Sequence, residues 1–180
     1  MTVPGLFRVA RPAGHVTNLA KTAIQVVIVW TFALVLLPWL AVSVEAWAGV
    51  PRWDWRGRIA LGGMVFALGS VVGLAAAWCM ATLGKGTPVP FDAARELVVA
   101  GPYRVVRNPM AVSAIVQTIG IAVMLGSVAT LVLAAGGGLV WNTLIRPPEE
   151  RFLHHRFGPA YDRYRAEVRC WIPRWPPYSS

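Results

Sequence analysis

The chain has 180 residues, of which 56% are hydrophobic and only 14% charged, and its mean hydropathy is +0.54. Soluble domains carry about a quarter charged residues, so this composition excludes an ordinary soluble enzyme. The formal charge of +9 could indicate nucleic-acid binding, but the charges avoid three long runs, residues 22–44, 59–84 and 109–145. Such uncharged apolar runs are typical of membrane spans, and no nucleic-acid partner is expected.

The first run predicts a transmembrane helix over residues 22–48, because about 20 apolar residues cross a bilayer. Pro38 is expected to kink this helix. No small-residue cleavage pattern follows the run, so it is predicted to be a retained span rather than a signal peptide. Residues 1–21 form a basic lead-in that contains prolines and glycines.

A short external loop with two interfacial tryptophans leads to a second predicted span over residues 58–83. Gly69 and Gly73 in that span have the small-xxx-small spacing that favours close helix contact. The third run is long enough for two short helices, residues 110–125 and 128–146, with a turn at Gly126-Ser127. Gly136-Gly137-Gly138 in the last helix are expected to serve packing, with a thinned helix beside a ligand as the alternative.

Two polar segments separate and follow these spans. Residues 84–109 have turn residues at both ends, yet they include apolar side chains that need burial, so an ordered and functional loop is predicted. Those side chains are Phe91, Leu97, Val98, Val99 and Tyr103. In the C-terminal part, 147–180, Pro147-Pro148 are expected to start a helix and Gly158-Pro159 to break it and start another. Tyr161, Tyr164 and Val168 would share one face of that second helix.

The basic residues predict the orientation. With four spans both termini lie on one side, and 14 of the 17 Lys and Arg residues fall on that side together with the 84–109 loop. The opposite side keeps Arg52, Arg56 and Arg58. The positive-inside rule therefore predicts a multi-pass protein of the inner or plasma membrane, with both termini and both polar segments cytoplasmic.

Common catalytic motifs are missing from the sequence. It has no Rossmann fingerprint, Walker lysine motif, H-E-x-x-H or G-x-S-x-G. Cys79 and Cys170 make no disulfide framework, and the three histidines lack metal-ligand spacing, so no metal is expected. The candidate chemistry is a group at residues 103–108 and the acidic pair Glu149-Glu150.

Each candidate residue has a plain structural role and a sharper functional one. Glu149 and Glu150 could cap a helix and pair with Arg146 or Arg151, or accept hydrogen bonds from a ligand diol or face its amino group. Arg107 could contact lipid phosphate or clamp a ligand carboxylate. Together the residues offer an anion receptor, a cation or diol receptor and aromatic surfaces, which would suit a zwitterionic nucleoside.

The runs GTPVPFDAARELVVAGPYRVVRNPM and PPEERFLHHRFGPAYDRYRAEVRCWIP resemble the isoprenylcysteine carboxyl methyltransferase and phospholipid methyltransferase family. The shared pattern is Leu-Val, Gly-Pro-Tyr, Arg-(His/Asn)-Pro, Glu-Glu, Phe-Gly, Tyr-x-x-Tyr and a terminal Ile-Pro, over residues 84–173. The resemblance implies an all-α integral membrane methyltransferase with about four spans. Its S-adenosylmethionine would lie in a cytoplasmic pocket capped by the 84–109 loop and the C-terminal helices.

The resemblance also implies site residues. Arg107 and Glu150 are the expected catalytic residues, and both are also expected to contact the cofactor. The other expected cofactor-binding residues are Leu97, Val98, Gly101, Tyr103, Asn108, Pro109, Glu149, Tyr161 and Tyr164. Two departures from the family pattern stand out: Asn108 replaces a common His and cannot act as an acid or base near neutrality, and Ala111 and Ser113 replace Tyr and Gly.

The sequence does not identify the methyl acceptor. A carboxylate, thiol or amine on a small or lipophilic molecule fits, and a lipophilic acceptor would enter from the bilayer. An NADPH-dependent membrane reductase of the sterol-reductase type is the alternative enzyme. A non-enzymatic lipid-binding membrane protein is the alternative outside enzymes.

Overall fold

The computed structural model describes residues 8–87 and 92–179. Within these residues it is 71% helix and contains no strand, although an isolated bridge pairs Val9 with Ala93. Three helices are long and apolar enough to cross a membrane, His15–Trp47, Arg58–Thr82 and Val128–Phe157, and a shorter apolar helix lies at Pro109–Leu125. The predicted all-α membrane class is confirmed. Phe91, expected to be buried, and most of the first ten residues lie outside the described ranges.

The first long helix combines α1 (His15–Thr31), a π-helical turn at Phe32–Leu36 and α2 (Leu37–Trp47). It begins at His15 rather than at residue 22, and its polar residues Asn18 and Thr22 are buried on its inner face. The π-helical turn lies directly before Pro38. A proline ring crowds the carbonyl four residues earlier, and the wider turn accommodates it, so the helix runs on.

The same arrangement, a π-helical turn shortly before a proline, changes the boundary that was predicted between the last span and the C-terminal helices. A second π-helical turn, Trp141–Ile145, follows α5 (Val128–Val140) and lies directly before Pro147. Pro147 and Pro148 lie in the first turn of α6 (Arg146–Phe157), as predicted, but α6 is continuous with the preceding span, and together they form one 30-residue helix. Gly158 does end it, and α7 (Pro159–Glu167) follows as predicted. The apolar part, residues 128–145, is the membrane-crossing part, and the charged α6 extends beyond it.

Close packing of α3 (Arg58–Thr82) against α4 (Pro109–Leu125) forms the centre of the bundle. A Cβ atom added at Gly69 would lie 2.9 Å from Gln117 Cγ, and one at Gly73 would clash with Ser113. The prediction of close contact at these glycines is confirmed. Gly136 and Gly137 have no neighbouring atom within 4 Å of such a Cβ, so the packing prediction is wrong there, while Gly138 meets Ile115 at 3.0 Å.

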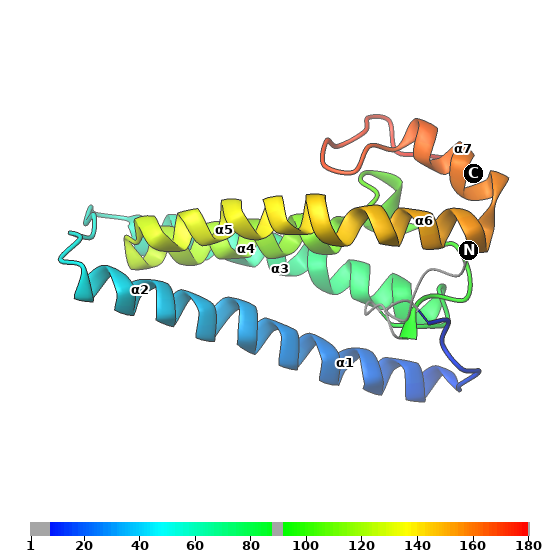
Figure 1. Cartoon of the computed structure of the whole chain (residues 1–180), viewed down its shortest axis with the longest axis horizontal. Coiled ribbons are helices and arrows are strands. Elements are labelled where there is room, and N and C mark those ends of the chain that lie inside the picture. The colour runs from blue at the N-terminus through cyan, green and yellow to red at the C-terminus, as the bar shows by residue number, and fades with distance from the viewer. Residues whose placement is uncertain (1–7, 88–91, 180) are drawn as a thin grey trace.

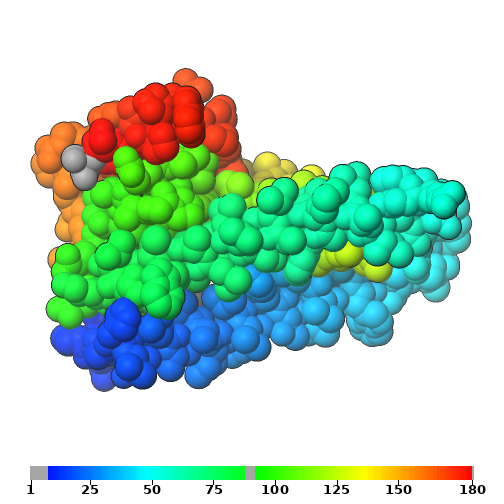
Figure 2. All heavy atoms as spheres, turned by 180° about the vertical axis from the view of Figure 1, so that it is seen from behind, coloured from blue at the N-terminus to red at the C-terminus, as the bar shows by residue number. Residues whose placement is uncertain are grey.

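The first described residues, from Arg8, and the last ones, up to Ser179, lie at the same end of the bundle as α6, α7 and the described residues between α3 and α4 (Figure 1). Seen from behind, the C-terminal residues rest on the residues around position 100 (Figure 2). At the opposite end the α2–α3 loop packs on the α4–α5 turn, where Trp53 N donates to Gly126 O at 3.1 Å. This arrangement agrees with the predicted placing of the two polar segments on one side.

Candidate active site

A cavity of about 300 Å³ lies where α1, α4, α6 and α7 meet the 92–108 segment. Its lining includes nine of the eleven expected site residues: Leu97, Val98, Tyr103, Arg107, Asn108, Glu149, Glu150, Tyr161 and Tyr164. Gly101 and Pro109 do not line it. Gly101 instead has a φ of 55°, and a Cβ there would meet Cys79 Sγ at 2.8 Å, while Pro109 is buried at the first turn of α4.

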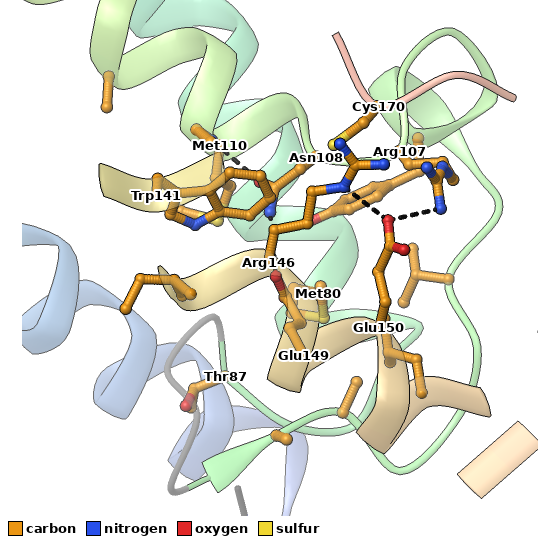
Figure 3. Close-up of a pocket in the computed structure, with 18 of the residues that line it drawn as sticks. Met80, Thr87, Arg107, Asn108, Met110, Trp141, Arg146, Glu149, Glu150 and Cys170 are labelled. Atoms are coloured by element: carbon orange, nitrogen blue, oxygen red, sulfur yellow. Dashed lines mark hydrogen bonds and ion pairs between the residues drawn. The ribbon is translucent and has the colours of Figure 1, made fainter. Parts of the chain in front are cut away.

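Glu150 is the centre of the polar end (Figure 3). Its Oε1 lies 2.9 Å from Arg107 Nη1 and 2.8 Å from Arg146 Nε, and its Oε2 lies 3.6 Å from Arg165 Nε. Burial opposes ionisation of this carboxyl, but the hydrogen bond from Arg146 and the charges of the three arginines outweigh it and lower the pKa of Glu150. Glu150 therefore stays ionised at neutral pH, and its ion pairs connect the loop that contains Arg107 with α6 and α7.

Glu149, the neighbouring carboxyl, has the opposite character. Burial and the charge of Glu150 raise its pKa to about 7, against an opposing effect of Arg107. Its Oε2 accepts a long hydrogen bond of 3.5 Å from Asn108 Nδ2. Two adjacent carboxyls whose pKa values are driven apart are typical of acid–base assignments in active sites, and Glu149 is the member that can exchange a proton near neutrality.

Asn108, which stands where the resembling family commonly has a histidine, has a structural role that suits an asparagine. It is the N-cap of α4: its Oδ1 accepts a hydrogen bond from Ala111 N at 3.0 Å, and Asn is among the best capping residues. The remaining amide group faces Glu149. The second departure concerns Ala111 and Ser113. Ala111 lines the cavity, whereas Ser113 does not and donates a hydrogen bond to Gly69 O at 2.8 Å.

Tyr161 and Tyr164 share a buried face of α7, as predicted. Val168 lies just beyond the helix, in extended backbone, but packs in the same buried cluster. Tyr164 OH donates to Tyr103 O at 2.7 Å, and Arg107 Nη1 donates to Tyr161 OH at 3.3 Å. Burial raises the pKa of Tyr161 to about 12, so its phenol stays protonated at neutral pH. The tyrosines thus hold the loop against α7 as neutral hydrogen-bonding groups.

Residues 168–179, called here the C-terminal strap, contact the site, although no sequence pattern predicted that they would. Three backbone bonds tie the strap to residues 104–107: Arg107 N to Arg169 O at 3.0 Å, and Arg174 N to Val105 O and Tyr178 N to Arg104 O, both at 2.9 Å. The strap also reaches the π-helical turn between α5 and α6, because Asn142 Oδ1 accepts a hydrogen bond from Trp171 Nε1 at 2.8 Å. The same oxygen accepts from Arg146 Nη1 at 2.9 Å. No periodic pattern in the sequence signals backbone bonds between such distant segments.

The other half of the cavity is apolar, and sequence reasoning did not find it. It runs between α1 and α4 and is lined mainly by aliphatic and aromatic side chains, with Gln25 and Gln117 as polar exceptions. The apolar lining includes Val26, Val29, Trp30, Leu34, Met110, Ala114 and Trp141. These residues look like ordinary span residues in the sequence, so only the packing of helices reveals them.

Two buried polar atoms in the lining lack partners among the described residues: Arg107 Nε and Gln25 Oε1. Buried polar atoms are nearly always hydrogen-bonded, so unpartnered ones in a cavity favour a bound ligand. The cavity thus offers a charged end with a spare donor and an apolar end in the bilayer.

The helical membrane fold and the family to which its sequence motifs belong define the class of this protein, a membrane methyltransferase. The family model of the phospholipid methyltransferases matches residues 57–160, more than half of the chain, and the chain belongs to that family. This confirms the predicted relationship to methyltransferases of the isoprenylcysteine carboxyl type. The match includes α3, which the quoted motifs did not, and stops before Tyr161. Comparison with curated proteins finds no match.

Proposed function

We propose that the chain transfers a methyl group from S-adenosylmethionine to a lipophilic acceptor. The observation that carries the proposal is that one cavity has both a charged end, at Arg107 and Glu149-Glu150, and an apolar end between α1 and α4. A zwitterionic nucleoside suits the first end and an acyl or prenyl chain the second. A cavity of about 300 Å³ is at the small end for such sites, so we expect helix α1 to yield as the acceptor enters.

The residues present fit the proposed cofactor. Arg107 supplies the unpartnered donor for a carboxylate, and the two glutamates supply acceptors for an amino group or a ribose diol. Leu97, Val98 and Tyr103 supply apolar and aromatic surface for the adenine. When bound, the cofactor would supply a methyl group on a positively charged sulfur, and the sulfur would leave as a neutral thioether when an aligned nucleophile takes the methyl group.

The chain's own residues then mainly align the reactants and exclude water. A carboxylate acceptor needs no base. For an amine or thiol acceptor, Glu149 is the proposed base, since its pKa of about 7 lets it take a proton at neutral pH. Glu150, held by its arginines, keeps Arg107 in place rather than exchanging protons.

The acceptor is proposed to enter sideways from the bilayer and the cofactor from the cytoplasm. Support for the first route comes from the apolar lining contributed by α1, whose outer face is exposed along the span. Support for the second comes from the basic residues around both polar segments.

The test is methyl transfer in vesicles. Purified protein in lipid vesicles receives S-adenosylmethionine with a radioactive methyl group, and the organic and aqueous phases are counted after extraction. We expect label in the organic phase, lost in Glu150→Ala and retained in the control variant Asp54→Ala, which removes an exposed carboxylate at the opposite end of the bundle. Label transferred only to water-soluble products would contradict the lipophilic acceptor. If the label stayed on S-adenosylmethionine in both phases, even after membrane extract is added as a source of acceptors, that result would contradict methyl transfer.

A further inference from the structure

The strap carries an exposed apolar tip. Ile172 is 56% exposed and Trp175 is 88% exposed, and prolines 173 and 176 flank them on the surface. Single exposed apolar side chains are ordinary. Two large ones within four residues, on a segment that otherwise packs on the site, call for a surface to cover them.

The contacts of the neighbouring Trp171 give the depth of this tip. Its ring lies 5.2 Å from the Trp141 ring, centre to centre, and its Nε1 donates to Asn142 Oδ1. Trp141 and Asn142 belong to the last turns of the apolar 128–145 stretch. Figure 1 shows the segment after α7 turning back beside the α5–α6 helix instead of extending past the bundle end. The strap at Trp171 therefore lies level with the end of the apolar 128–145 stretch, the level at which a headgroup layer is expected, and Ile172 follows it directly in the chain.

The charge around the tip fits the same environment. Arg169 is exposed and has no acidic partner among the described residues, while Arg174 pairs with Glu167 at 3.0 Å and stacks over Tyr178. Basic side chains next to an indole are the composition of a membrane interface, in which the ring lies among the glycerol groups and the cations contact lipid phosphate.

We propose that Ile172 and Trp175 insert into the headgroup layer of the membrane that the bundle crosses, and that this anchor holds the strap over the site. The strap reaches the site through its three backbone bonds to residues 104–107, one of which uses the amide of Arg107. The bilayer thereby stabilises the position of an arginine in the cavity. The inference does not depend on which methyl donor binds.

The depth of Trp175 is tested by fluorine NMR. The protein is labelled with 5-fluorotryptophan in nanodiscs, and Trp175→Phe assigns the signal. Broadening is compared between lipids with a headgroup spin label and a soluble gadolinium chelate. We expect the Trp175 signal to respond more to the lipid label, as should Trp47, which is 90% exposed at the opposite end of the bundle. A stronger response to the soluble chelate overturns the proposal.

The link to the site is tested by amide hydrogen exchange in nanodiscs. The variant with Ile172→Asp and Trp175→Asp should exchange the amide hydrogens of Arg107, Arg174 and Tyr178 at least tenfold faster than the parent chain. Trp47→Asp, which changes an equally exposed ring at the other membrane face, should leave those rates unchanged. Equal rates in the double variant and the parent would overturn the coupling, and the NMR result on the folded parent remains decisive if the double variant fails to fold.

Discussion

Arg107 Nη1 lies 2.9 Å from Glu150 Oε1, and this contact joins the loop before α4 to the helix after α5. Both side chains are largely buried, so the pair is shielded from the screening that weakens surface ion pairs. Arg146 and Arg165 approach the same carboxylate, which makes Glu150 the point where the polar half of the cavity is held together.

Removing Arg107 tests its role toward the ligand. Arg107→Ala deletes the spare donor in the cavity but leaves Glu150 with two arginines. We therefore expect a folded protein whose affinity for S-adenosylhomocysteine falls at least tenfold, about 1.4 kcal/mol, by isothermal titration. Arg163→Ala removes the same charge from the exposed side of α7 and should leave the affinity unchanged. Equal affinity in both variants would contradict the role of Arg107.

The pKa of Glu149 predicts a pH dependence of stability. The carboxyl ionises near its ordinary pKa in the unfolded chain but only at about 7 in the folded one. Between these values the unfolded state binds fewer protons, so the free energy of unfolding decreases as pH rises and then stays reduced above pH 7. Glu149→Gln lacks this loss, so its melting temperature should exceed that of the parent increasingly from pH 5 to 7.5. A constant difference across that range would contradict the raised pKa.

Glu45 separates fold stability from the site. It is 4% exposed, and its Oε1 accepts a 2.6 Å hydrogen bond from Ala129 N at the start of α5. Capping bonds of this kind contribute about 1–2 kcal/mol. Glu45→Ala should lower the melting temperature while the affinity for S-adenosylhomocysteine stays the same, and Glu45→Gln, which keeps an acceptor, should lose less stability. A large change in affinity would show that the two ends of the bundle are coupled.

The glycines give a matched pair of substitutions. Gly62→Ala would place a Cβ 2.5 Å from Gly120 O in the α3–α4 contact, so it should destabilise the bundle strongly or prevent folding. Gly137→Ala meets open space and should be neutral or stabilising, by up to about 1 kcal/mol. Thermal unfolding of both variants in detergent checks this contrast, and comparable losses would argue against the observed helix contact.

Local patterns were sufficient to predict much of the bundle. Uncharged runs defined the spans, Gly158-Pro159 marked the break between α6 and α7, and the spacing of Tyr161, Tyr164 and Val168 identified one buried face. Pro147 and Pro148 do lie in the first turn of α6, but the continuity of α6 with α5 was not predicted, because no residue pattern signalled the π-helical turn that joins them.

Only the polar part of the candidate site could be predicted from the sequence. Charged and tyrosine residues are conspicuous in an apolar chain, so Arg107 and Glu150 could be singled out before their contact was known. The apolar lining from α1 and the backbone bonds of the strap depend on how distant segments pack, and neither involves unusual residues. The shared carboxylate of Glu150 likewise needed the structure, because its three arginines come from the loop, α6 and α7.

The most direct test of the proposed activity is a binding titration of the detergent-solubilised protein with S-adenosylhomocysteine and, separately, with NADPH. We predict saturable binding of S-adenosylhomocysteine that is lost in Glu150→Ala and kept in Asp54→Ala, with no binding of NADPH. Binding of NADPH alone would favour a reductase, and binding of neither ligand by folded protein would favour a lipid-binding role. Either result would contradict a methyltransferase site at Arg107 and Glu150.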